Sequence, residues 1–123
     1  MCFVIPMFCE RQIADEDKIV YKTGFVVKNK YFDSAIRGYR YILNKENPFV
    51  MPLIEHQGVP VIDKGYHSYG KDSKEICHNE LYDIVECIIP KDSVYYYNGL
   101  EDTYVSSNII IKQQIDKKMF RPK

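Results

Sequence analysis

The segment Asp83-Ile-Val-Glu-Cys-Ile-Ile-Pro90 constrains the fold more than any other part of the sequence. Isoleucine and valine favour extended backbone, and a proline ends a run that pairs through its N–H groups. Side chains alternate between the two faces of a strand. Here both faces carry apolar side chains: Ile84 and Ile88 on one, Val85, Cys87 and Ile89 on the other. A strand that is apolar on both faces belongs in the middle of a sheet, so the sequence predicts a sheet-based core.

Length and charge restrict the number of domains and the class of protein to which this core can belong. A chain of 123 residues has room for one core, so we expect a single globular domain over residues 1–116 and a charged tail over residues 117–123. Seventeen basic and seventeen acidic residues cancel, which disfavours broad nucleic-acid binding, because such proteins carry a basic surplus. No apolar run reaches the length of a transmembrane helix, so we expect no membrane partner.

Further strands are predicted where β-branched and aromatic residues lie between turn signals. The dipeptide Asn98-Gly99 predicts a tight turn between two of them, and Gly24 inside another predicts a bulge or a close backbone approach. The predicted strands are residues 19–27, a strand after the turn at Lys64-Gly65, residues 93–97, residues 103–105 and residues 109–112.

Other segments leave more open. Residues 72–79 are the best helix candidate, because Asp72 and Glu75 have the spacing of a capping box. We expect a strand or buried arm over residues 1–9, a turn or short helical segment over 12–18, and a long irregular segment over 44–60. Residues 31–43 fit either a capped helix or a loop followed by a short strand, and we favour the second. The expected fold class is therefore α+β: a compact, mainly antiparallel sheet with one or two short helices.

The four cysteines have no zinc-binding or Cys-x-x-Cys spacing, and the N-terminus has no charged leader. We therefore expect a cytoplasmic protein with reduced thiols. Cys2 has two interpretations. Without Met1 it would pair a thiol with a free amine, as in N-terminal nucleophile hydrolases. Within an apolar first strand it is a small buried side chain, which we favour.

Histidines and tyrosines are the remaining candidates for chemistry. His67 suits acid–base work near neutral pH, or else is a hydrogen-bonded histidine at a strand end. Cys77 and His78 are adjacent on a helix and do not share a face, so we expect no metal site and no cofactor. Tyr95 and Tyr97 share one face of a strand, where they could stack on a nucleobase or simply pack across strands.

The sequence resembles a family of small proteins from phages and gut bacteria. A phage-encoded member would act in the host cytoplasm. The matching features, in order, are Met1-Cys2, Ile13-Ala14 with Asp17 and Val20-Tyr21-Lys22, Gly65-Tyr66-His67-Ser68-Tyr69, and Val85-Glu86-Cys87-Ile88-Ile89-Pro90-Lys91. This resemblance implies a compact domain and no particular activity.

The second half also resembles the core of ADP-ribosyltransferase-like domains. In those domains an early strand carries an aromatic–basic pair, a Gly-aromatic-x-Ser segment precedes a helix, and a strand ending in Ile-Pro-Lys follows. Here Tyr21-Lys22, residues 65–69 and residues 88–92 match in order. The family's catalytic Glu falls where this chain has Ser106-Ser107-Asn108, so the resemblance implies a β-rich fold with a cleft and argues against transferase activity.

We therefore expect a non-catalytic binding protein of phage or mobile-element type, with no catalytic residue, that holds a nucleotide-like ligand or a partner protein. The expected ligand-binding residues are Tyr21, Lys22, Tyr66, His67, Tyr69 and Tyr95. Two alternatives remain. One is a structural protein with a tyrosine-rich interface in a homo-oligomer. The other is an enzyme, either a diverged transferase or a Cys2 thiol hydrolase.

Overall fold

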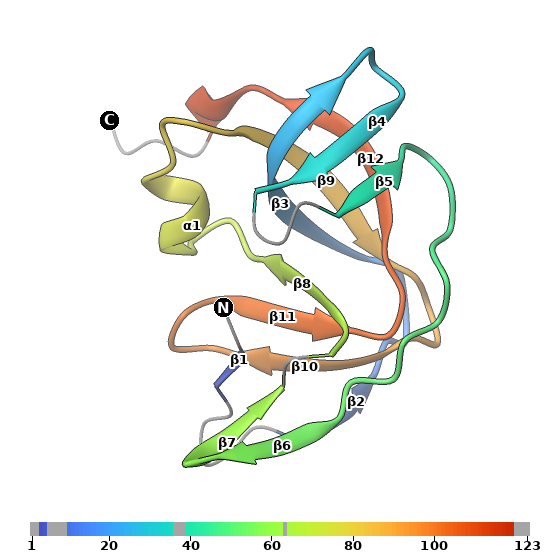
Figure 1. The fold of residues 1–123 in the computed structure, drawn as a ribbon, viewed down its shortest axis with the longest axis vertical. Coiled ribbons are helices and arrows are strands. Elements are labelled where there is room, and N and C mark those ends of the chain that lie inside the picture. Colours follow the sequence, from blue (N-terminus) through green and yellow to red (C-terminus); the bar gives the residue numbers. More distant parts are fainter. Residues whose placement is uncertain (1–2, 5–9, 36–38, 63, 120–123) are drawn as a thin grey trace.

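The computed structural model describes residues 3–4, 10–35, 39–62 and 64–119. Its strands form two antiparallel sheets, with one short α-helix, α1 (Lys74–Cys77), beside them and a 3₁₀ turn at Lys117–Met119 (Figure 1). The strands are β1 (Phe3–Val4), β2 (Gln12–Ile13), β3 (Lys18–Val27), β4 (Tyr31–Ser34), β5 (Arg40–Ile42), β6 (Ile54–Gln57), β7 (Val59–Ile62), β8 (Tyr66–Tyr69), β9 (Asp83–Ile89), β10 (Val94–Asn98), β11 (Thr103–Ser106) and β12 (Ile110–Ile115). The mainly antiparallel architecture predicted from the sequence is confirmed. No helix in these ranges is long and apolar enough to span a membrane.

Strand β9 occupies the central position that its two apolar faces predict. The larger sheet has the order β12-β9-β3-β8-β11-β10-β2, and the smaller has the order β1-β7-β6. Ile84, Val85, Cys87 and Ile89 of β9 are all fully buried. One edge of β9 pairs with β12 and the other with β3, from Lys18 opposite Ile89 to Gly24 opposite Asp83.

The edge of β3 that faces away from β9 is shared by two partners. Tyr21 pairs with Tyr69 of β8, whereas the residues from Gly24 to Val27 pair with β4. Strand β5 continues beyond β4 as the second strand of a hairpin. The two partners diverge between these pairings, at Lys22 and Thr23, and we call this point the β3 fork. In Figure 1 β8 and the β4–β5 hairpin leave β3 in different directions.

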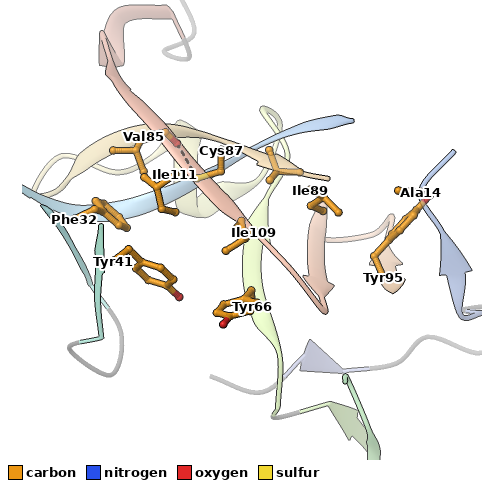
Figure 2. Packing of buried hydrophobic residues seen from close by; sticks show 11 residues of the cluster. Ala14, Phe32, Tyr41, Tyr66, Val85, Cys87, Ile89, Tyr95, Ile109 and Ile111 are labelled. Carbon is orange, nitrogen blue, oxygen red and sulfur yellow. Dashed lines mark hydrogen bonds between the residues drawn. The ribbon is translucent and has the colours of Figure 1, made fainter. Parts of the chain in front are cut away.

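The main core lies on the Lys22 side of β3. Phe32 of β4, Tyr41 of β5 and Tyr66 of β8 pack there with Val85, Cys87 and other apolar side chains of β9 and β12 (Figure 2). A smaller cluster of Ile62, Tyr96 and Val105 lies between β7, β10 and β11. Tyr95 and Tyr96 thus enter different clusters, because neighbouring residues of a strand point to opposite faces.

The connection between β5 and β6 is held to the sheet by hydrogen bonds. The backbone N–H of Val50 donates to the Ser107 carbonyl at 2.9 Å, and the Asn47 side chain donates to the Ile109 carbonyl at 2.9 Å. The Tyr66 hydroxyl donates to the Pro48 carbonyl at 2.6 Å. These bonds fix an otherwise irregular segment over the core.

The structure also corrects the sequence analysis at the ends of elements. The helix at 72–79 is confirmed only over Lys74–Cys77, and its N-cap is Ser73, whose hydroxyl accepts from the Glu75 N–H, so the predicted Asp72 cap is wrong. Residues 12–13 form β2 rather than a turn or helix, because their backbone pairs with β10. The expected loop before β5 contains β4, and the irregular segment 44–60 ends in the β6–β7 hairpin. Backbone pairing decided each of these strands, with a distant partner for β2 and with neighbouring strands of the chain for β4 and for the β6–β7 hairpin. All are too short to show a pattern.

Two further expectations lie partly or wholly outside the described residues. Of the predicted N-terminal arm, only β1 is described, pairing with β7, and Cys2 and Cys9 lie outside. The tail beyond Met119 lies outside as well.

We predict that Gly24→Ala destabilises the protein by about 3 kcal/mol, the upper range for inserting atoms into a packed region. A Cβ at Gly24 would overlap the Asp33 carbonyl oxygen and lie 2.8 Å from the Phe32 ring, so β4 would have to move off β3. Urea denaturation measures the loss. The matched control is Gly99→Ala, where the nearest atom is 3.5 Å away in the Tyr97 side chain. Equal stability of the two variants would contradict the prediction.

Candidate functional site

A cavity of about 360 Å³ opens at the β3 fork. That volume falls in the range of small-molecule sites. Strand β3, the β4–β5 hairpin, the β5–β6 connection and β8 contribute its lining. The lining residues are Lys22, Thr23, Ser34, Tyr39, Tyr41, Pro48, Val50, Gly65, Tyr66, His67 and Tyr69.

Lys22 is the distinctive residue of this cavity. It is only 6% exposed, although lysine is almost never buried without a partner. Its Nζ donates a hydrogen bond to the His67 carbonyl oxygen and lies 5.4 Å from the centre of the Tyr41 ring. Burial lowers the pKa of Lys22 to about 8, because a low-polarity surrounding disfavours the charged amine.

The described lining has no acidic residue to balance the charge of Lys22. None of the described lining residues is Asp or Glu. Burial raises the pKa values of Tyr41 and Tyr66, so both phenols keep their protons at physiological pH. The ammonium of Lys22 therefore has no carboxylate beside it in the described lining, and the cavity suits an anionic group.

Aromatic rings surround this cation. Tyr41 is 5% exposed, and its ring centre lies 6.1 Å from that of Tyr66 (Figure 2). Tyr39 lies two residues from Tyr41 along the chain, with 4.6 Å between the ring centres, and is 48% exposed. Tyr39 thus stands at the mouth of the cavity, with a ring face available to a planar ligand.

Gly65 shapes the cavity by its backbone. Its φ of +120° is disfavoured for residues with a side chain, and a Cβ there would lie 2.7 Å from Val105. The chain at the start of β8 therefore runs close to β11. Gly65 also lines the cavity.

Four of the six residues expected from the sequence line the cavity: Lys22, Tyr66, His67 and Tyr69. His67 meets Lys22 through its carbonyl oxygen, while its ring Nε2 lies 3.3 Å from the Ile62 carbonyl oxygen of β7. The burial pattern of β8 has the alternation expected for a strand with Tyr66 and Ser68 on one face and His67 and Tyr69 on the other.

Tyr21 and Tyr95 do not belong to the lining. Tyr21 precedes Lys22 and so faces the opposite side of β3, where burial and the nearby Glu86 carboxylate raise its pKa. Tyr95 lies in β10, separated from β8 by β11, and its hydroxyl donates to the Gln12 side chain at 2.9 Å. Only 6% of Tyr95 is exposed, because it packs in the main core.

The sequence did not predict that Tyr39 and Tyr41 belong to the site. Tyr39 and Tyr41 alternate as they would on a strand, and this was the available signal. Nothing in the local sequence shows that β5 lies across the fork from Lys22, because β5 reaches β3 only through β4.

A second, more open depression of about 560 Å³ adjoins the cavity, and Tyr39 and Pro48 line both. It also carries Arg40, Lys45 and Phe49. Arg40 is already paired with Asp33 at 2.7 Å. A ligand too long for the cavity has room to continue past Tyr39.

Metal and thiol chemistry have little basis in the described ranges. They contain no group of three or more His, Cys, Asp or Glu side chains that could hold a metal ion. Burial raises the pKa of the Cys87 thiol to about 12, so the thiolate is not populated at physiological pH.

Comparisons with protein-family models, with curated proteins and with solved structures find no match for this chain.

We predict that Lys22→Met stabilises the protein by about 2 kcal/mol at pH 7, because it removes a buried charge that has no carboxylate partner among the described lining residues. The pKa of Lys22 is lower in the folded chain than its ordinary value of 10.5, so between about pH 8 and pH 10.5 the unfolded chain binds more protons. Stability of the natural protein should therefore rise as the pH increases from about 7 to about 9, and the variant should lack this rise. Thermal unfolding at both pH values measures the difference. A variant less stable than the natural protein, with the pH dependence intact, would contradict the prediction.

Proposed function

We propose that this protein is a non-catalytic binding module that holds a small, planar, anionic ligand of nucleotide type in the cavity at the β3 fork. The observation that carries the proposal is the buried Lys22 ammonium in a tyrosine-rich lining without a carboxylate among its described residues. A phosphate or similar group would complete the charge balance at Lys22, while Tyr39 and Tyr41 offer ring faces to a base.

The buried charge itself supports a binding role. A lysine in this position weakens the fold, and a methionine or leucine would fill the same space without that cost. Residues that reduce stability persist most often at functional sites. Lys22 lies at the fork, where the strand pairing leaves space, and this supports a ligand more than a structural role.

We also propose that the fold is ADP-ribosyltransferase-like. In support, the strand with the Tyr21-Lys22 pair lies beside the strand with the Gly-Tyr-His-Ser segment, as the resemblance requires.

The family's catalytic Glu would fall at residues 106–108. Ser106 lies opposite Tyr66, and its hydroxyl donates to the Asn108 carbonyl at 2.9 Å. The Ser107 hydroxyl donates to the Asn108 side chain at 2.9 Å. The Ser107 hydroxyl also accepts from the Val94 N–H at 3.0 Å. Both hydroxyls are engaged by the protein's own groups and supply no charge for a developing sugar cation, which favours binding over transfer.

The alternative of a tyrosine-rich oligomer interface has less support. Of the eleven tyrosines, all of which are described, Tyr39 is the one that is exposed. Four others, Tyr41, Tyr66, Tyr95 and Tyr96, are buried, and the remaining six are only partly exposed. An oligomer interface of this kind needs several aromatic side chains fully at the surface.

We predict that adenosine 5′-monophosphate binds with a dissociation constant in the micromolar to millimolar range, and that adenosine binds more weakly because it lacks the phosphate. Tyr39→Ala should weaken binding by about 5- to 150-fold, since stacking on a base contributes about 1–3 kcal/mol. Affinity should fall as the pH rises from about 7 to about 9, because Lys22 loses its proton near pH 8. Isothermal titration calorimetry measures these changes.

The matched control is Phe25→Ala, an exposed aromatic residue outside the cavity lining that should leave binding unchanged. The proposal fails if no nucleoside phosphate binds, or if Tyr39→Ala and Phe25→Ala bind equally well while both remain folded.

A further inference from the structure

We infer that Lys22 is also a nucleophile, whose side-chain amine forms an imine with an aldehyde group of a ligand in the β3-fork cavity. The inference rests on the proposed function, because it uses the same cavity. It adds a chemical class to the ligand: an anionic molecule of nucleotide size with a free or ring-opened aldehyde.

The surroundings of Lys22 suit an amine that changes its protonation state. The Nζ atom has a backbone carbonyl as its hydrogen-bond acceptor, and a carbonyl accepts from a neutral amine as well as from an ammonium. A carboxylate partner would hold the lysine in its charged form, and the described lining has none.

The His67 imidazole also lines the cavity, with its Nε2 3.3 Å from the Ile62 carbonyl oxygen. Three further titratable groups packed around Lys22 come from three strands and keep their protons at physiological pH. They are the Tyr41 phenol of β5, the Tyr66 phenol of β8 and the Cys87 thiol of β9, each with a raised pKa. Since burial also lowers the pKa of Lys22 from 10.5 to about 8, its neutral fraction at pH 7 exceeds that of an exposed lysine more than a hundredfold. Desolvation in a pocket is the usual way to activate a lysine amine.

The reaction balances without an oxidant or reductant. The lone pair of Nζ forms a bond to the aldehyde carbon, and a proton moves from nitrogen to the carbonyl oxygen to give a carbinolamine. The carbon–oxygen bond then breaks, the remaining proton of the nitrogen leaves with the hydroxyl group as water, and a carbon–nitrogen double bond remains.

The test uses pyridoxal 5′-phosphate, which is planar, anionic and an aldehyde, at less than one equivalent and pH 7. Cyanoborohydride reduces any imine to a stable amine, and peptide mass spectrometry locates it. We expect Lys22 to carry at least ten times more label than any exposed lysine. Lys22→Arg and Lys22→Met should both lose this label. Lys71→Arg, an exposed lysine outside the lining, is the matched control and should keep it.

Pyridoxine 5′-phosphate, which has an alcohol in place of the aldehyde, separates the two proposals. If it binds the natural protein and pyridoxal 5′-phosphate leaves no preferred label at Lys22, the inference is overturned and the proposed function stands. If Lys22 is labelled while neither pyridoxine 5′-phosphate nor a nucleotide binds, the reactive lysine stands and the proposed function fails. Uniform labelling of all lysines overturns the inference, because it shows an ordinary amine.

Discussion

The site depends on one constraint of strand pairing: a strand edge can be shared by two partners only if they diverge. Strand β3 pairs with β9 along seven residues on one edge, whereas its other edge pairs first with β8 and then with β4. Right-handed twist rotates neighbouring strands relative to one another, so two partners on one edge separate as they leave it. The space between them is the cavity, and Lys22 and Thr23 belong to its lining.

The same fork explains why a charge is buried there. A lysine in the middle of a sheet is surrounded by apolar neighbours, here Val20 and Val85, which compete for the space that water would need. At the fork the backbone of β8 instead offers the His67 carbonyl, and the Tyr41 ring offers its face. These contacts compensate part of the desolvation and leave the rest to a ligand. The charge of Lys22 therefore lowers the stability of the free protein and favours ligand binding. A substitution that removes this charge should change stability and affinity in opposite directions.

Much of the sheet could be predicted from local sequence, because each signal acts over a few residues. The central position of β9 follows from apolar side chains on both its faces, and the close approach at Gly24 follows from a glycine inside a β-branched run. The β10–β11 hairpin follows from Asn98-Gly99, although its turn runs to Asp102, which takes a positive φ of 51°. Signals failed where a short strand is stabilised by its partner rather than by a pattern of its own. Strand β2 pairs with the distant β10, and β4 pairs with β3 across the turn at residues 28–30.

The sequence by itself determined the class of the protein and half of the site. Alternation of apolar residues gave a mainly antiparallel sheet, and the chemistry of Lys22, Tyr66 and His67 marked them as candidates. Only the tertiary structure decided which candidates meet. It places Tyr39 and Tyr41 beside Lys22 and turns Tyr21 and Tyr95 away. The physical reason is that the pairing of β8 with β3 joins residues far apart in the chain, and no local pattern of side chains encodes where β8 and β4 separate along one edge of β3.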